Sequence, residues 1–146
     1  MQEALNPLRM RAALVFVFVW FFLGGIAHFA FMAEEMRAVP PYISWPREAV
    51  IISGVCELLG ALGLLWLRTR RLAAWGLFAL TVALTPANVY MFQHPEMFVS
   101  VPVWALAARL PLQLVLLALI AWIAVRSGRA KSTARGQSKK SGNALR

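Results

Sequence analysis

Acidic residues and cysteine are scarce in this chain. Its 146 residues include 6 Asp and Glu against 15 Lys and Arg, and charged residues make up only 14%. A soluble domain carries about a quarter charged residues. The single cysteine, Cys56, excludes an intramolecular disulfide and a CxxC thiol relay within the chain. With 60% hydrophobic residues, the composition indicates a membrane protein rather than a soluble domain.

Long apolar runs dominate the sequence. A helix needs about 20 apolar residues to cross the hydrocarbon core of a bilayer. Four runs meet this length, at about 12–31, 49–67, 72–92 and 103–125, and short loops separate them. The first run follows two arginines, as in a signal peptide, but it is too long for a signal core and no cleavage site follows. The sequence therefore predicts an all-α membrane protein with a four-helix transmembrane domain over 1–126.

Positive charge is distributed unevenly between the loops. Basic residues precede the first run, fill the link between the second and third runs, and follow the fourth, whereas acids and bases roughly cancel in the other two loops. Because Lys and Arg in short loops remain on the cytoplasmic side, we expect both termini to be cytoplasmic. The net charge of +9 is thus a topology signal.

The segment 127–146 is rich in Ser, Gly, Lys and Arg and has almost no large apolar residue. Such a segment cannot bury a core, so we expect a disordered basic tail. Its basic residues would contact anionic lipid headgroups, at about 1 kcal/mol for each residue near the surface. No aromatic residue interleaves the charges, and we expect no nucleic-acid partner.

Each predicted helix carries a polar residue in the half of the membrane that we assign as outer. These residues are His28, Glu57, Asn88, Arg109 and Gln113. At 1.5 Å per residue, Glu57 lies about 12 Å below the outer end of its helix. An ionisable residue at such a depth is costly and therefore needs a partner or a purpose. We predict that the five side chains form one polar ligand-binding pocket.

Helical spacing places small residues on the same faces as these polar groups. Ser53, Glu57 and Gly60 share one face, and Gly24 lies one turn before His28. Two prolines, Pro86 and Pro111, are expected to interrupt the third and fourth helices beside the pocket.

The main alternative is that these polar groups only hold the helices together. In either case Glu57 is expected to pair with Arg109, because a paired charge costs less than an isolated one. A metal or haem site involving His28 and His94 is disfavoured, since no spacing matches a known ligand set. No metal is expected.

Several stretches of the sequence together form a recognisable pattern: GIAHF at 25–29, PY at 41–42, WP at 45–46, SGVCELLGALGLL at 53–65, RLAAWGL at 71–77, PANVYM at 86–91 and RLPLQ at 109–113. With these stretches the sequence resembles the DoxX-like family of small bacterial membrane proteins. The resemblance implies a four-helix bundle in the bacterial cytoplasmic (inner) membrane. Some members of that family are subunits of quinone-linked oxidase systems, so it also implies association with a membrane oxidoreductase. It supplies no catalytic residues.

Three functions are compatible with these features. The first is an accessory subunit that binds a small amphipathic molecule such as a quinone in the polar pocket, with a redox partner supplying the electrons. The second is a scaffold or assembly factor without catalysis. The third is a proton-coupled transporter, which is disfavoured because four helices make a small solvent path and no internal repeat is present.

Overall fold

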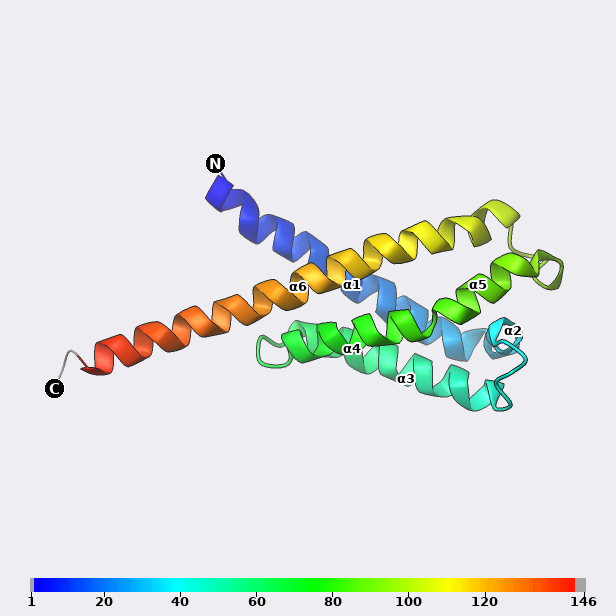
Figure 1. Cartoon of the computed structure of the whole chain (residues 1–146), viewed down its shortest axis with the longest axis horizontal. Coiled ribbons are helices and arrows are strands. Elements are labelled where there is room, and N and C mark those ends of the chain that lie inside the picture. The colour runs from blue at the N-terminus through cyan, green and yellow to red at the C-terminus, as the bar shows by residue number, and fades with distance from the viewer. Residues whose placement is uncertain (1, 144–146) are drawn as a thin grey trace.

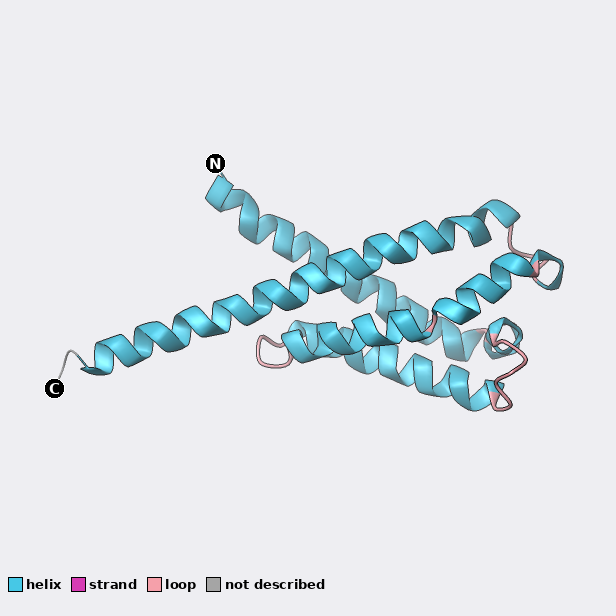
Figure 2. Cartoon of the chain, in the orientation of Figure 1, coloured by secondary structure: helices cyan, strands magenta, loops and turns pink. Residues whose placement is uncertain are grey.

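A computed structural model describes the backbone of residues 2–143 and the side chains of residues 7–128. All described elements are helices (Figure 2). They are α1 (Gln2–Ala30), α2 (Met32–Ala38), α3 (Pro46–Leu65), α4 (Arg70–Ala83), α5 (Thr85–Gln93), the 3-10 helix η1 (Pro95–Met97) and α6 (Val103–Asn143). Four stretches are long and apolar enough to cross a membrane: Pro7–Ala30, Pro46–Leu65, Arg70–Gln93 and Val103–Gly128. The prediction of a multi-pass, all-α membrane protein is confirmed at this level.

The spanning helices form a four-sided bundle. α3 packs between α1 and α4, whereas α6 packs mainly on α4 and α5 and more lightly on α1. α3 and α6 are thus opposite one another across the bundle. α2 and η1 lie at one end, which we call the α2 end, and the α3–α4 turn lies at the other (Figure 1). α1 and α6 cross in the half of the bundle nearer the α3–α4 turn and diverge toward the α2 end (Figure 1).

The ends of α3 follow from its sequence. Pro46 occupies the first turn, where its missing N–H is not needed, and Glu48 complements the positive end of the helix dipole. At the other end, Thr69 Oγ1 donates to the carbonyl of Gly63 at 2.8 Å. Arg70 Nε donates to the carbonyl of Leu64, also at 2.8 Å. These bonds satisfy carbonyls that have no partner within the helix.

The third spanning segment is broken, as predicted from Pro86. α4 ends at Ala83, and α5 begins at Thr85 with Pro86 in its first turn. Proline lacks the N–H that would continue the helical ladder, and its ring disfavours helical geometry just before it. Pro111 behaves differently, because it lies inside α6 and the helix continues through it. The predicted interruption of the fourth helix is therefore wrong.

α6 extends far beyond the predicted fourth span. The structure describes residues 127–143 as a continuation of this helix, ending at Asn143, and residues 144–146 lie outside the described part of the chain. The expected disordered basic tail stays a prediction. This segment contains no proline, and its Lys, Arg, Ala and Gln residues have high helix propensity. Extending an existing helix also avoids the cost of nucleation. Basic residues near a helix C-terminus are further favoured by the dipole.

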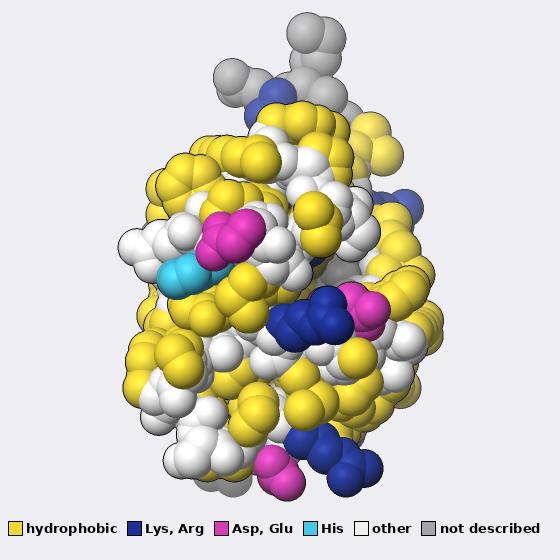
Figure 3. All heavy atoms as spheres, turned by 90° about the vertical axis from the view of Figure 1, so that its right-hand side faces the viewer, with side chains coloured by type: hydrophobic (Ala, Val, Ile, Leu, Met, Phe, Trp, Pro, Cys, Tyr) yellow, Lys and Arg dark blue, Asp and Glu magenta, His cyan; other side chains and the backbone are white. Residues whose placement is uncertain are grey.

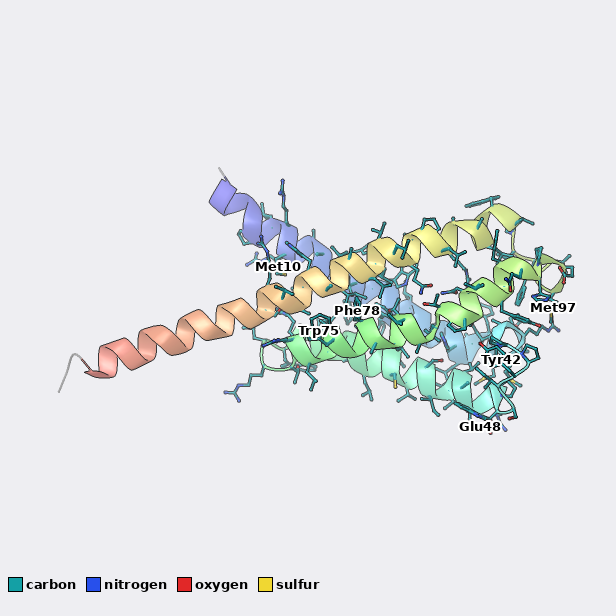
Figure 4. All side chains as sticks on the ribbon, in the orientation of Figure 1. Met10, Tyr42, Glu48, Trp75, Phe78 and Met97 are labelled. Atoms are coloured by element: carbon teal, nitrogen blue, oxygen red, sulfur yellow. The ribbon has the colours of Figure 1, made fainter. Side chains whose placement is uncertain are left out.

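Two apolar clusters form the core. The larger draws on α1, α3, α4 and α6 and contains Ala13, Val17, Phe21, Ala61, Leu64, Ala74, Leu77, Leu116, Ile120, Ile123 and Ala124. The smaller lies at the α2 end and contains Ala38, Met91, Phe98 and Leu106. Figure 4 shows the labelled Trp75 and Phe78 on α4 toward the α3–α4 turn, while Tyr42 and Met97 lie at the α2 end. The predicted polar residues lie between these clusters.

Candidate functional site

A cavity of about 560 Å³ lies between the two apolar clusters. Residues from α1 through α6 line it, including the five predicted from the sequence, His28, Glu57, Asn88, Arg109 and Gln113. Its volume falls within the range of about 300–1,000 Å³ that is typical of small-molecule sites. The structure thus brings the five predicted side chains to one cavity, but their hydrogen bonds divide them into two groups.

Glu57 is the least satisfied polar residue of the cavity. Its side chain is buried, with the residue 6% exposed. Among the buried side-chain atoms that the structure describes, Oε2 of Glu57 is the one without a hydrogen-bond partner. Leaving a buried acceptor unpaired costs about 1–3 kcal/mol. This carboxylate oxygen is therefore available to a hydrogen-bond donor in the cavity.

Glycines of α1 and α3 leave the space that the Glu57 carboxylate occupies. A Cβ at Gly24 would lie 2.8 Å from Oε2 of Glu57, so a side chain there would displace the carboxylate. A Cβ at Gly54 would lie 2.9 Å from Cβ of His28. The small residues predicted at this interface thus allow α1 and α3 to approach closely.

His28 is the basic residue that lies within ion-pair distance of Glu57. Its Nδ1 lies 3.7 Å from Oε2 of Glu57, which is within ion-pair range but too long for a hydrogen bond. The same Nδ1 is 2.9 Å from the carbonyl oxygen of Gly24, to which it donates. His28 therefore adds positive charge near the carboxylate when it is protonated, while its hydrogen bond is made within α1.

Asn88 and Gln113 form a hydrogen-bonded network that links α4, α5 and α6. Asn88 Nδ2 donates to Oε1 of Gln113 at 2.6 Å. Gln113 Nε2 donates to the carbonyl oxygen of Thr81 at 3.0 Å and to Oγ1 of Thr85. The Thr81 carbonyl lies just before the helix break, where it can accept a side-chain bond. These two residues fit the alternative interpretation, in which polar groups hold the helices together.

The predicted ion pair between Glu57 and Arg109 is not formed. Arg109 is exposed, and its Nη1 lies 3.4 Å from Sδ of Met91, a weak acceptor. The prediction failed because α3 and α6 are opposite rather than adjacent helices, and because Glu57 leans toward the space at Gly24. Within residues 7–128, Arg109 makes no ion pair, so its guanidinium can serve an acceptor in the cavity.

Sequence reasoning missed one wall of the cavity. Four apolar residues of α1, namely Phe16, Val19, Trp20 and Leu23, line the cavity and are also partly exposed on the outside of the bundle. Glu35 of α2, one of the acids between the first and second predicted spans, also lines the cavity. In the sequence these residues resemble any lipid-facing residue or loop acid, and only the divergence of α1 from α6 reveals their position.

His94 does not belong to the site. Its Nδ1 lies 3.1 Å from the carbonyl oxygen of Tyr90, and its ring lies 4.3 Å from the Tyr90 ring. It is not among the residues that line the cavity. Within the part of the chain that the structure describes, no three His, Cys, Asp or Glu side chains gather as metal ligands would.

One family model matches the chain, over residues 17–125, and it describes a domain of unknown function, DUF8561. The match covers the spanning stretches Pro46–Leu65 and Arg70–Gln93 completely, and most of Pro7–Ala30 and Val103–Gly128. The chain belongs to the DUF8561 family. No curated protein matches it, and no solved structure does. The likeness to the DoxX-like family stays a prediction. The DUF8561 region contains the whole cavity wall except Phe16.

Proposed function

We propose that this DUF8561 protein binds a small amphipathic molecule, with a quinone as the leading candidate, in the cavity between α1, α3, α5 and α6. The observation that carries the proposal is the buried, unpartnered Oε2 of Glu57 in a cavity that Arg109 also lines. A carboxylate that served only to join helices would be expected to have a hydrogen-bond partner in the protein. The missing partner is therefore assigned to a ligand.

Two groups define the head of that ligand: Oε2 of Glu57, which has no hydrogen-bond partner, and the guanidinium of Arg109, which makes no ion pair within residues 7–128. Oε2 of Glu57 accepts from a hydroxyl, and the guanidinium of Arg109 donates to a carbonyl or another oxygen. The quinol and quinone forms of one molecule offer both kinds of group. The apolar side chains of α1 provide a surface for the rest of the molecule.

A quinone site of this kind needs a redox partner. No side chain of the cavity carries electrons, so a membrane oxidoreductase supplies them and the protein acts as an accessory subunit. Glu57 accepts or returns the proton that accompanies the change between quinone and quinol, and the charges of His28 and Arg109 influence that transfer.

The same proposal includes an orientation in the bacterial cytoplasmic membrane. The α2 end shows both Lys or Arg and Asp or Glu side chains among hydrophobic ones (Figure 3). At the opposite end, the α3–α4 turn contains Arg68, and α4 begins with Arg70 and Arg71. The positive-inside tendency places that turn and both termini in the cytoplasm. The cavity then lies in the outer half of the membrane.

A scaffold remains the second candidate, and the network of Asn88 and Gln113 favours it. In a scaffold all polar groups would stabilise the bundle, and no ligand would be required. The two functions predict different effects of replacing Arg109, which makes no ion pair within residues 7–128. The replacement should weaken ligand binding if the protein is a ligand-binding subunit, whereas a scaffold has no ligand to lose.

The test is a titration of the purified protein in lipid nanodiscs with an isoprenoid benzoquinone. Replacing a charge-assisted bond costs about 1.5–3 kcal/mol, so Arg109→Gln should weaken binding about tenfold or more. Leu59→Ala, on the lipid-facing side of α3 and outside the cavity, is the control and should bind as the wild type does. Absence of saturable binding to the wild type would leave the scaffold as the function.

A further inference from the structure

The cavity opens sideways, between α1 and α6. At the α2 end, Ala38, Met91, Phe98 and Leu106 close the bundle. Toward the other end, the larger cluster closes it where α1 crosses α6. Between these closures α1 and α6 diverge (Figure 1). The remaining wall, formed by Phe16, Val19, Trp20 and Leu23 of α1, is partly exposed on the outside of the protein.

Because α1 is long and apolar enough to span a membrane, this opening would face hydrocarbon rather than water when it does so. The four wall residues lie within the spanning stretch Pro7–Ala30. Leu23, for example, is 59% exposed although it also lines the cavity. A molecule that passes this wall therefore travels from the lipid phase directly to the polar groups.

We propose that the gap between α1 and α6 is a lateral portal, through which a membrane-resident lipid inserts its polar head while its apolar chain stays in the bilayer against Val19, Trp20 and Leu23. This deepens the proposed function, on which it rests, by naming the substrate class as a lipid with a long chain. A water-soluble molecule of the same head chemistry is excluded from the class. The chain gains little free energy from the wall, because lipid is as apolar as these side chains. The portal therefore determines the route and orientation of the ligand rather than its affinity.

The experiment uses two photoreactive benzoquinones in proteoliposomes that contain the full chain. One carries a diazirine on the ring, and the other carries it on the isoprenoid chain close to the ring. After photolysis, peptide mass spectrometry locates the labelled residues, with excess unlabelled quinone as competitor. The ring probe should label residues around Glu57 and Arg109. The chain probe should label the segment 16–23 of α1, and the competitor should suppress both signals.

Matched variants test the route. Leu23→Trp narrows the portal and should lower labelling by the chain probe severalfold. Leu59→Trp changes the same residue type on α3, where Leu59 is 65% exposed and outside the cavity, and should leave labelling unchanged.

The outcomes separate the two proposals. Labelling of the cavity by the ring probe, with chain-probe labels on the α2 end or spread evenly over the lipid-facing surface, would overturn the portal and retain the site. Equal labelling in Leu23→Trp and Leu59→Trp would also overturn the portal. If the competitor suppresses no label from either probe, the proposed function itself is wrong.

Discussion

Glu57 and Gln113 offer a matched pair for separating a ligand-binding residue from a structural one. They are nearly equal in size, and they are 6% and 7% exposed. Methionine is unbranched and follows the same path as either side chain while removing its hydrogen-bonding groups. We therefore compare Glu57→Met with Gln113→Met, and we expect the free energy of unfolding to change in opposite directions.

The expected magnitudes follow from the hydrogen bonds. Oε2 of Glu57 has no partner, so Glu57→Met removes a cost of about 1–3 kcal/mol and should raise stability by up to that amount. Gln113→Met leaves Asn88 Nδ2 and the Thr81 carbonyl without their bonds to Gln113. Interhelical hydrogen bonds in membranes average about 0.6 kcal/mol and reach about 1.7, so the loss should be about 1–3 kcal/mol.

The assay is reversible unfolding in mixed micelles, followed by tryptophan fluorescence. The chain has 6 Trp residues, which provide the signal without labelling. Quinone binding is measured on the same samples. Glu57→Met should be more stable and bind less, which is the usual consequence of replacing a residue kept for function. A destabilised Glu57→Met would refute the reasoning, because it would show that the carboxylate holds the bundle together.

Three further predictions concern the bundle and its orientation. A Cβ at Gly60 would lie 2.6 Å from Cγ of Leu77, whereas nothing lies within 4 Å of a Cβ at Gly76. The Gly60→Ala variant should therefore be less stable than Gly76→Ala by about 1–3 kcal/mol. Equal unfolding curves for the two variants would contradict this packing. Deleting residues 131–146 should leave the melting temperature unchanged, since both apolar clusters lie before this segment; loss of membrane insertion would contradict it. A reporter fused after Arg146 should be active only in the cytoplasm; periplasmic activity would reverse the orientation.

Much of the fold was predictable because membrane-spanning helices are recognised in a sequence by their length and apolar composition. The four predicted spans correspond to the four candidate spanning stretches of the structure. The break near Pro86 was also predictable from backbone chemistry, whereas Pro111 was not, because a helix can continue past one proline when its surroundings permit. The continuation of α6 beyond the predicted fourth span was not predictable, because a basic segment without apolar residues gives no packing signal of its own.

The candidate site was likewise predictable in part. The depth of each residue along its helix was enough to predict that five side chains line one cavity, because the rise per residue determines that depth. The partner of each side chain depends on which helices are neighbours, and a single sequence does not contain that information. Glu57 and Arg109 were paired by charge and depth alone, but α3 and α6 are opposite in the bundle. The pairing of Asn88 with Gln113 was missed for the same reason.

The most direct test of the ligand-binding site is native mass spectrometry of the protein released from its own membranes without added quinone. The wild type should carry a bound amphipathic molecule, which fragmentation would identify as a quinone. The double variant Glu57→Met with Arg109→Gln should reach the detector without it. Leu59→Ala should retain it. An unliganded wild type, or equal loading of wild type and double variant, would contradict the account.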